Sequence, residues 1–408
     1  MPSIHYVTCR ACGDAVEQFL DLGRQPLSDA FRSPEDASDE FWLHLRAVVC
    51  RGCNVVQLAD PGPVERMFHG GYPFRTSSSV RMSLHFAATA ERLVAGLKSP
   101  DPFVVEIGSN DGTMLAPIAN RGIRHLGIDP AANMVAEALT RKVNARAEWF
   151  DAAIAAEIRN EFGPADIVYA ANTMCHIPDL HGVFEGLETL LAGDGIVVFE
   201  DPYLGDVLRL GSFDQIYDEH FYLFSAAAVA RIAELHGFAL VAVEHLEVHG
   251  GELRYTLARD GRAPSPDVAA LIATEDCEGT HSLARLEAFA AEVADRRARL
   301  RDVLVDEHRS DRSVAGYAAT AKSATVLNYC GIGPELLPVV YDTTPEKQGR
   351  MTPGSHIPVE PFPTDLADYP DAFLLFAWNH AGEIVAKERQ FVDRGGRWIR
   401  YVPDVRIG

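Results

Sequence analysis

The chain has 408 residues, of which 47% are hydrophobic and 23% are charged, and its formal net charge is -21. This composition is typical of a globular protein with two or three domains, and it excludes a largely disordered chain. The excess of acidic residues argues against a nucleic-acid partner, since such surfaces depend on clustered Lys and Arg. We find neither a secretory leader nor a run of about 18 apolar residues, so we expect a cytoplasmic protein with no membrane partner.

Near the N-terminus the sequence contains two C-x-x-C pairs, in CRAC and CRGC: Cys9, Cys12, Cys50 and Cys53. Each pair can chelate a metal, and four thiolates fill the tetrahedral shell of a structural zinc ion. We expect zinc to stabilise residues 1–65, because so short a segment has too little apolar material for its own core. Redox disulfides are the alternative, but the thioredoxin-like βαβ context is missing. The other cysteines are interpreted as ordinary small residues: Cys175, Cys277 and Cys330.

The rest of the chain shows the alternation of strands and helices that is typical of parallel α/β sheets. An amphipathic helix is predicted over 76–97, with serines that can cap its start. Predicted strands follow in the segments FVVEIG, HLGIDP, ADIVYAAN and GIVVFEDP. A long helix of mixed charge separates them from a second, shorter α/β pattern. We therefore expect an α/β protein with three parts: a zinc-binding domain (1–65), a Rossmann-like domain (66–245) and a C-terminal α/β domain (246–408).

A glycine turn, VVEIGSNDGTML, follows the first predicted strand of the Rossmann-like domain. It contains Glu106, Gly108, Asn110 and Gly112, and Asp129 ends the next strand, where a carboxylate can bind ribose hydroxyls. The spacing is not G-x-G-x-x-G, but Asn110 can adopt the left-handed conformation of a middle glycine. Together these residues resemble motif I of class I S-adenosylmethionine-dependent methyltransferases. The plain alternative is a turn that only joins a strand to a helix.

This resemblance implies S-adenosylmethionine as the cofactor. It places Phe150 against the adenine ring, and the loop with Asn172 and His176 close to the transferable methyl group. His176 is alternatively a solvent-facing loop histidine. The cofactor-binding residues that we expect are Glu106, Gly108, Asn110, Asp111, Gly112, Asp129, Phe150, Asn172 and His176.

Tyr217, Glu219 and His220 fall within four residues, in the stretch IYDEHFY. They supply a phenol, a carboxylate and an imidazole, which are groups that move protons near neutral pH. Methylation of carbon requires an adjacent carbonyl, a base that removes a proton and a donor that holds the enolate oxygen. Methylation of oxygen or nitrogen requires at most one base. The triplet therefore favours a C-methyltransferase.

Six motifs occur in one order: the paired knuckles, EIGSNDG, YDEHFYLFS, VHGGELR, VLNYCGI and DTTPEKQGRMTPGSHIPV. Over nearly the whole chain this order resembles the sugar C-methyltransferases of deoxysugar biosynthesis, with the TDP-sugar C-3' methyltransferases as reference members. The resemblance implies methyl transfer to carbon 3 of a nucleotide-linked 4-keto-6-deoxysugar. His220 would be the base, Glu219 the neighbouring acid and Tyr217 a residue beside the sugar. Tyr72 would be a second catalytic tyrosine, although Phe74 competes for that role.

The same resemblance places the nucleotide-sugar between the middle and C-terminal domains. The substrate-binding residues that we expect are His249, Lys322, Asn328 and Arg350. Lys322 and Arg350 would neutralise the diphosphate, unless they are ordinary surface cations. His356 is as readily explained as a structural turn histidine. Reference members carry a Gly-Ala-Pro-Ala-Lys-Gly loop where this chain has YAATAKSATVLNY, which leaves the nucleotide base and the sugar open.

Two other functions stay open at this point. One is O- or N-methylation of a nucleotide-sugar or a related natural-product intermediate. The other is a zinc-ribbon binding protein whose α/β domains have lost activity, although the intact Glu106, Gly108, Asp129 and His220 count against it. A monomeric C-methyltransferase is the leading expectation.

Overall fold

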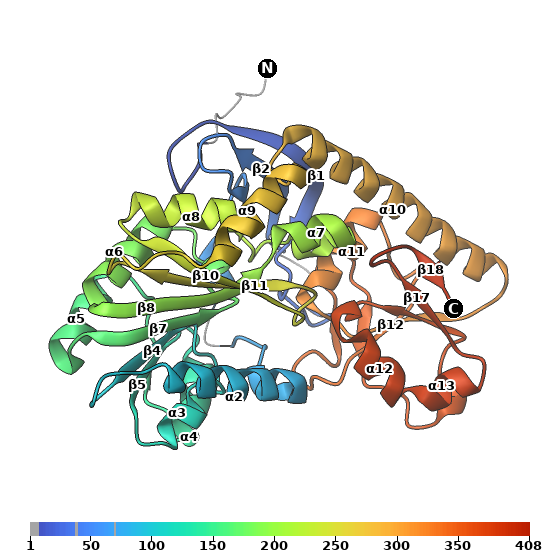
Figure 1. Cartoon of the computed structure of the whole chain (residues 1–408). Helices are drawn as coiled ribbons and strands as arrows, with labels where there is room; N and C mark the ends of the chain where they lie inside the picture. The colour runs from blue at the N-terminus through green and yellow to red at the C-terminus, as the bar shows by residue number, and fades with distance from the viewer. Residues whose placement is uncertain (1–7, 37–39, 69–70) are drawn as a thin grey trace.

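The computed structural model describes residues 8–36, 40–68 and 71–408, and its strands form three sheets (Figure 1). The N-terminal sheet has four antiparallel strands in the order β1-β2-β3-β9: β1 (Val16–Pro26), β2 (Trp42–Cys50), β3 (Val56–Leu58) and β9 (Tyr222–Leu223). A short helix, α1 (Val64–Met67), follows the sheet. The fourth strand, β9, belongs to the predicted catalytic stretch. The zinc-binding segment is therefore completed by a strand from the middle of the chain.

The middle sheet has seven strands in the order β10-β11-β8-β7-β4-β5-β6, of which β8 to β6 run parallel and β11 runs antiparallel. Their bounds are β4 (Phe103–Ile107), β5 (Arg124–Ile128), β6 (Ala145–Arg146), β7 (Ala165–Ala171), β8 (Leu191–Pro202), β10 (Ala239–Leu246) and β11 (Glu252–Ala258). This is the class I methyltransferase Rossmann-like fold, as predicted. The domain boundary expected at residue 245 falls inside the β10–β11 hairpin. This hairpin belongs to the middle sheet, because β11 pairs with β8.

Helices cover both faces of the middle sheet (Figure 1). One face carries α2 (Val80–Ala95), α3 (Ala116–Ala119) and α4 (Ala132–Thr140). The other carries α5 (Ala152–Phe162), α6 (Leu180–Leu190) and α8 (Ala226–Leu235), while α7 (Leu204–Leu210) follows β8. The helix predicted over 76–97 is divided: a 3₁₀ turn (Thr76–Ser78) precedes α2, and the Ser79 side chain caps α2 by accepting a hydrogen bond from the Met82 amide at 3.2 Å.

The C-terminal sheet also has seven strands, in the order β14-β15-β13-β12-β16-β17-β18. Their bounds are β12 (Val314–Tyr317), β13 (Val340–Tyr341), β14 (Arg350–Met351), β15 (Pro358–Glu360), β16 (Ala372–Leu375), β17 (Arg397–Arg400) and β18 (Arg406–Ile407). The five central strands are parallel, and the chain reverses its winding direction at β12, which lies between β13 and β16. The accompanying helices are α11 (Ala321–Cys330), α12 (Ala381–Lys387) and α13 (Arg389–Asp393).

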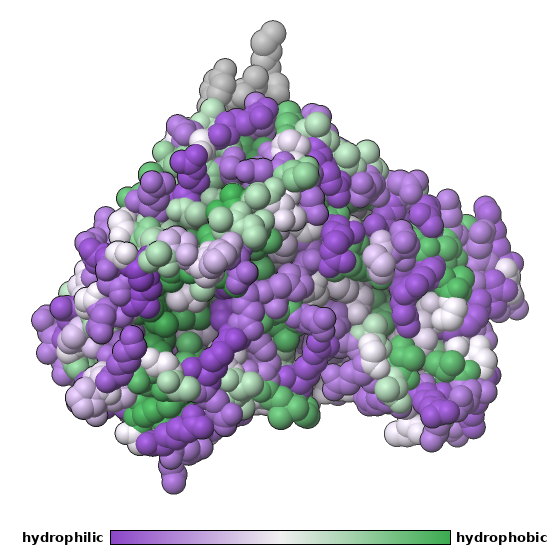
Figure 2. All heavy atoms as spheres, viewed as in Figure 1, coloured by the Kyte–Doolittle hydropathy of each residue, from purple (hydrophilic) through white to green (hydrophobic). Residues whose placement is uncertain are grey.

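Helices α9 (Pro266–Glu278) and α10 (Leu283–Arg309) connect the middle and C-terminal sheets. The long α10 runs across the molecule in Figure 1, and both α10 and α11 pack against β1 of the N-terminal sheet. The space-filling view shows a notch between the middle and C-terminal parts (Figure 2). Of the helices in the described ranges, none combines the length and the apolar character needed to cross a membrane.

Candidate active site

The four knuckle cysteines converge as predicted, with their sulfur atoms all within 4.8 Å of one another. Backbone amides point at these sulfurs: Ala11 donates to Cys9 Sγ at 3.4 Å and Gly52 donates to Cys50 Sγ at 3.3 Å. Such bonds stabilise thiolates, and four thiolates make a complete tetrahedral shell. Cys9, Cys12, Cys50 and Cys53 therefore fit a structural zinc ion, and a full shell leaves no position for a substrate.

A solvent-open cavity of about 390 Å³ lies where the middle and C-terminal sheets face each other. In open α/β sheets, ligands bind beyond the carboxyl ends of the strands, where the winding direction reverses. Here both sheets contribute such an end. The middle sheet supplies the loops after β4, β5, β6 and β7, and the C-terminal sheet supplies those after β12, β13 and β16. Each sheet thus contributes one wall of the cavity.

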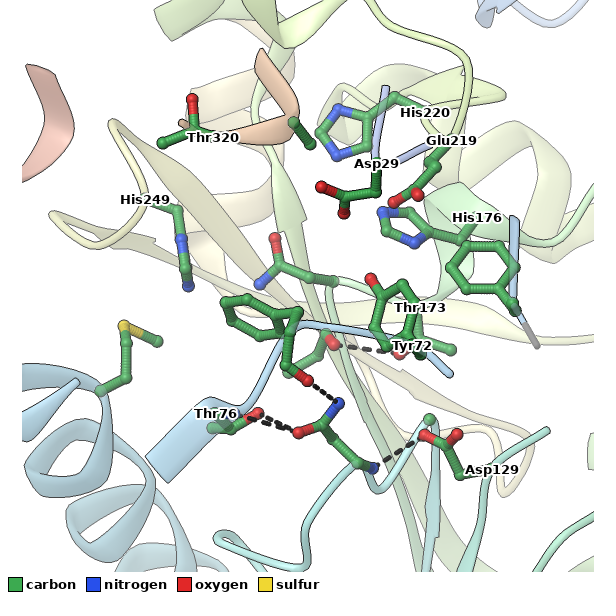
Figure 3. A pocket seen from close by; sticks show the side chains of 18 of the residues that line it. Asp29, Tyr72, Thr76, Asp129, Thr173, His176, Glu219, His220, His249 and Thr320 are labelled. Carbon is green, nitrogen blue, oxygen red and sulfur yellow. Dashed lines mark hydrogen bonds between the residues drawn. The ribbon is translucent and has the colours of Figure 1, made fainter. Parts of the chain in front are cut away.

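Asn110 connects the glycine turn to the segment that precedes α2, and its partners Thr76 and Asp129 are labelled in Figure 3. Its Oδ1 accepts hydrogen bonds from the Thr76 amide (3.0 Å) and the Thr76 hydroxyl (3.2 Å), and its Nδ2 donates to the Phe74 carbonyl (3.1 Å). Its backbone is left-handed, with φ of 46°, and its amide donates to Asp129 Oδ2 at 2.8 Å. Asn110 thus has the left-handed backbone that the sequence predicted. Its side chain also fixes one wall of the cavity.

Asp129 and Gly108 have the properties that a bound S-adenosylmethionine requires. Each carboxylate oxygen of Asp129 accepts one backbone amide, from Asn110 or Ala131, which leaves further lone pairs for ribose hydroxyls. A Cβ on Gly108 would lie 2.1 Å from Thr173 Oγ1, so only glycine allows the loops after β4 and β7 to approach this closely. The lining that the described middle sheet contributes contains no Lys or Arg, which suits a cationic sulfonium. Phe150 and Asn172 also line this part of the cavity.

His220 is buried in the cavity wall, with an exposed fraction of only 4%. Its Nδ1 lies 2.7 Å from the carbonyl oxygen of Gln215. A carbonyl only accepts hydrogen bonds, so Nδ1 carries the proton and Nε2 keeps a lone pair. Burial lowers the pKa of His220 well below 6.5, and the neighbouring His176 and Lys322 lower it further. His220 is therefore a neutral imidazole whose tautomer is fixed.

His176 and Tyr217 flank His220. The ring of His176 lies 5.0 Å from that of His220 and stacks on Phe68, whereas the ring of Tyr217 lies 4.1 Å from His220. His176 lines the cavity and is not a solvent-facing histidine; its Nε2 is buried without a hydrogen-bond partner in the described ranges, and burial lowers its pKa to about 3. Burial and the charge of Glu219 raise the pKa of Tyr217, so its hydroxyl keeps its proton and can donate.

Acidic groups gather beside His220, on the side of the cavity opposite Thr76 (Figure 3). Glu219 accepts no hydrogen bond from the described residues, and burial raises its pKa well above the usual value. Asp29, from the N-terminal segment, lies near Glu219. Its Oδ1 is buried without a hydrogen-bond partner in the part of the chain that the structure describes, and it lies 3.6 Å from Lys347 Nζ. Tyr72 lines the same region, and burial together with Glu219 raises its pKa. Phe74 also lines the cavity, but it is 46% exposed.

The C-terminal sheet contributes the cationic side of the cavity. Lys322, in the first turn of α11, lies over the Trp378 ring at 5.7 Å, and burial lowers its pKa. Asp214 accepts hydrogen bonds from both Trp378 and Tyr401 at 2.7 Å, which connects the catalytic stretch to this sheet. His249 also lines the cavity.

The departure from the reference loop is visible in the backbone after β12. Ala318 has a left-handed φ of 71°, a conformation that glycine adopts without strain. The Asp342 carboxylate supports this loop by accepting the Ala319 amide at 2.7 Å. Thr320, at the position of the reference proline, caps α11 and lines the cavity.

Five predicted site residues lie outside this cavity. Arg350 lines an adjoining cavity instead, and donates to the Phe31 carbonyl. Asn328 donates to the Pro353 carbonyl, and Asp111 accepts the Ser77 amide, so each holds a neighbouring segment in place. The remaining two are Glu106, buried within β4, and Gly112, which packs against Ala138 and Val143. His356, in contrast, is a turn histidine that bonds Glu40.

Sequence reasoning did not identify several cavity residues: Asp29, Phe68, Trp149, Thr173, Thr320 and Asp342. Thr173 and Thr320 lie in loops that strand ends bring to the cavity, and this position could have indicated them. No sequence signal indicated Asp29 or Phe68, because they reach the site only through the contact between the N-terminal segment and the catalytic stretch.

Three family models match the chain in succession. A zinc binding domain matches residues 9–68, a methyltransferase domain matches 82–243, and a C-methyltransferase C-terminal domain matches 247–403. C-methyltransferase NovU of Streptomyces niveus is 35% identical over 408 residues, which cover 98% of this chain and 96% of NovU.

Among solved structures, the magnesium protoporphyrin IX methyltransferase of Synechocystis with bound S-adenosylhomocysteine is 16% identical, with a TM-score of 0.35 over 48% of this chain and 91% of that one. The CcbJ methyltransferase of Streptomyces caelestis is 14% identical, with a TM-score of 0.33 over 44% of this chain and 90% of that one.

The two C-x-x-C knuckles, the Rossmann-like sheet and the match to NovU over nearly the full length lead to one assignment. The chain belongs to the S-adenosylmethionine-dependent C-methyltransferases that carry an N-terminal zinc-binding domain.

Proposed function

We propose that this C-methyltransferase acts on carbon 3 of a nucleotide-linked 4-keto-6-deoxysugar, with His220 as the base. The observation that carries the proposal is the hydrogen bond from His220 Nδ1 to the Gln215 carbonyl, which leaves a lone pair on Nε2. Methylation of oxygen or nitrogen would need at most one base and no donor for an enolate oxygen. A neutral imidazole with a fixed tautomer, next to two phenols and an acid, is suited to removing a proton from carbon.

In this proposal His220 Nε2 takes the proton from carbon 3, and the electron pair of the C–H bond moves into an enolate on the 4-keto group. Tyr217 and Glu219 are the candidate donors to the enolate oxygen, because both line the cavity with His220 and burial raises the pKa of each. Bound S-adenosylmethionine supplies an electrophilic methyl group. His220 would keep the proton taken from the sugar on Nε2.

The nucleotide-sugar would lie against the C-terminal sheet. Lys322 and Lys347 are the only Lys or Arg side chains in the described cavity lining, and Lys347 already faces Asp29. Lys322 has no hydrogen-bonded partner in the described chain, so it is the cation available to a diphosphate. This supports an anionic nucleotide carrier.

The deciding experiment incubates the enzyme with a panel of nucleotide-4-keto-6-deoxysugars in deuterated water, with and without methyl-labelled S-adenosylmethionine. We expect one sugar to gain a methyl group, and to take up deuterium at carbon 3 when the cofactor is left out. Mass spectrometry measures both. Methyl gain without deuterium uptake would instead point to transfer to oxygen or nitrogen.

His220→Asn tests the base directly. It should abolish both deuterium uptake and methyl transfer while leaving cofactor affinity unchanged. His356→Asn is the matched control, since His356 lies outside the cavity, and it should behave as wild type. An active His220→Asn enzyme would remove His220 as the base.

A further inference from the structure

Both zinc knuckles carry an arginine between their cysteines, but the two arginines differ in their surroundings. Arg51, in CRGC, has a side chain that is 54% exposed and forms a surface ion pair with Glu17 at 2.6 Å. Arg10, in CRAC, is partly buried and points toward the catalytic stretch. Its guanidinium donates to the Leu58 carbonyl at 2.8 Å and to the Phe221 carbonyl at 3.2 Å.

Phe221 directly follows His220, so Arg10 anchors the backbone one residue beyond the proposed base. The Phe221 carbonyl also accepts the Leu58 amide at 3.0 Å, at the start of the β3–β9 pairing. On the other side of the base, Asp218 accepts the Ser28 amide at 3.1 Å. The N-terminal segment therefore holds the catalytic stretch on both sides of His220.

Through Tyr222, Arg10 also connects to the loop that carries His176. Its Nε donates to the Tyr222 hydroxyl at 3.3 Å, and that hydroxyl donates to the Pro178 carbonyl at 2.7 Å. Pro178 ends the loop that carries His176. One arginine and one tyrosine thus connect the zinc knuckle to both loops whose histidine rings lie 5.0 Å apart.

Among the described residues, no such connection joins the knuckle to Asp129 and Gly108, on the ribose side of the cofactor site. Asp129 and Gly108 are positioned by the strand ends of β5 and β4, and by hydrogen bonds within the middle sheet and its glycine turn. A disturbance at the knuckle should therefore reach the histidines without reaching Asp129 and Gly108, on the ribose side of the cofactor site.

We infer that Arg10 is a positioning residue that couples the zinc knuckle to His220 and His176, so that loss of this link disables proton transfer while cofactor binding persists. The catalytic part of this inference rests on the proposed role of His220 as the base. The link itself consists of the contacts of Arg10 and Tyr222 and can be measured separately.

The test compares Arg10→Gln with Arg51→Gln in the full-length, zinc-loaded enzyme. Arg10→Gln should accelerate backbone hydrogen exchange in 173–178 and 217–223 and lower kcat by about 10- to 100-fold, the usual effect of a base displaced by about 1 Å. Zinc content, measured by elemental analysis, and affinity for S-adenosylhomocysteine should match wild type. Arg51→Gln should change none of these quantities.

Two further variants keep the test decisive if Arg10→Gln folds poorly. Tyr222→Phe removes only the bridging hydroxyl and should show the same exchange and kcat effects in a milder form. Arg10→Lys keeps the charge but not the forked donors, so it should restore only part of the activity.

The inference is overturned if Arg10→Gln and Tyr222→Phe match Arg51→Gln in exchange and turnover. It is also overturned if zinc content or cofactor affinity falls in step with kcat, since the role of Arg10 would then be merely structural. If the wild-type enzyme methylates no sugar in the panel, the proposed function fails, and the exchange rates alone decide whether the link exists.

Discussion

His220, the proposed base, lies in surroundings that keep its imidazole neutral. Burial lowers its pKa well below 6.5, and the bond to Gln215 fixes the proton on Nδ1. A lowered pKa means that the unprotonated form persists as the pH falls below 6.5. We therefore expect kcat/KM to stay flat from neutral pH down through 6.5, and to decline only at a lower pH at which His220 takes a proton.

A pH–rate profile with the accepted sugar checks this prediction, provided that circular dichroism shows a folded enzyme across the range. An acid limb centred at or above 6.5 would contradict it, because the base would then behave as an ordinary exposed histidine. His176→Asn provides a useful comparison. The His176 ring contributes to the lowering of the His220 pKa, so removing this ring should shift the acid limb to higher pH.

At the scale of elements, the glycine turn after β4 works together with the segment before α2. Asn110 supplies both a left-handed backbone and three side-chain hydrogen bonds, to Thr76 and Phe74. Asn110→Gly keeps the backbone conformation and loses the side chain, whereas Asn110→Ala loses both. We expect Asn110→Gly to lower the affinity for S-adenosylhomocysteine about tenfold. Asn110→Ala should lower this affinity more and should also lower Tm.

Calorimetry and thermal unfolding separate these two effects. Equal affinities for wild type and Asn110→Gly would show that the segment 74–76 is not needed for the cofactor. Thr113→Ala, in the same turn but outside the cavity lining, is the control and should bind as wild type does.

The sequence predicted the elements better than their contacts. The glycine turn, the knuckles and the triplet around His220 are local patterns, so they could be read from short segments. The pairing of β9 with β3 joins segments far apart in the chain, and no local pattern indicates it. Glu106 is a buried acid in β4 that does not line the cavity, so its expected contact with the cofactor stays a prediction.

At the scale of the whole molecule, two α/β sheets face each other across one cavity and differ in charge. The middle sheet offers Asp129 and no described Lys or Arg, and the C-terminal sheet offers Lys322. The cationic cofactor and the proposed anionic nucleotide would thereby be directed to opposite walls. Such a division implies that each wall can be disabled without the other.

We therefore expect a double dissociation. Asp129→Ala should weaken S-adenosylhomocysteine about tenfold or more, since a carboxylate that bonds ribose hydroxyls contributes about 1.5–3 kcal/mol, and it should leave nucleoside diphosphate affinity unchanged. Lys322→Met keeps the length of the side chain without its charge, and should have the reverse effect. Isothermal titration of both ligands with both variants measures all four affinities, and Tm shows whether each variant is folded. If either substitution lowers the affinities for both ligands equally, the two walls are not independent. The cavity must then form as a single unit around whichever ligand binds first.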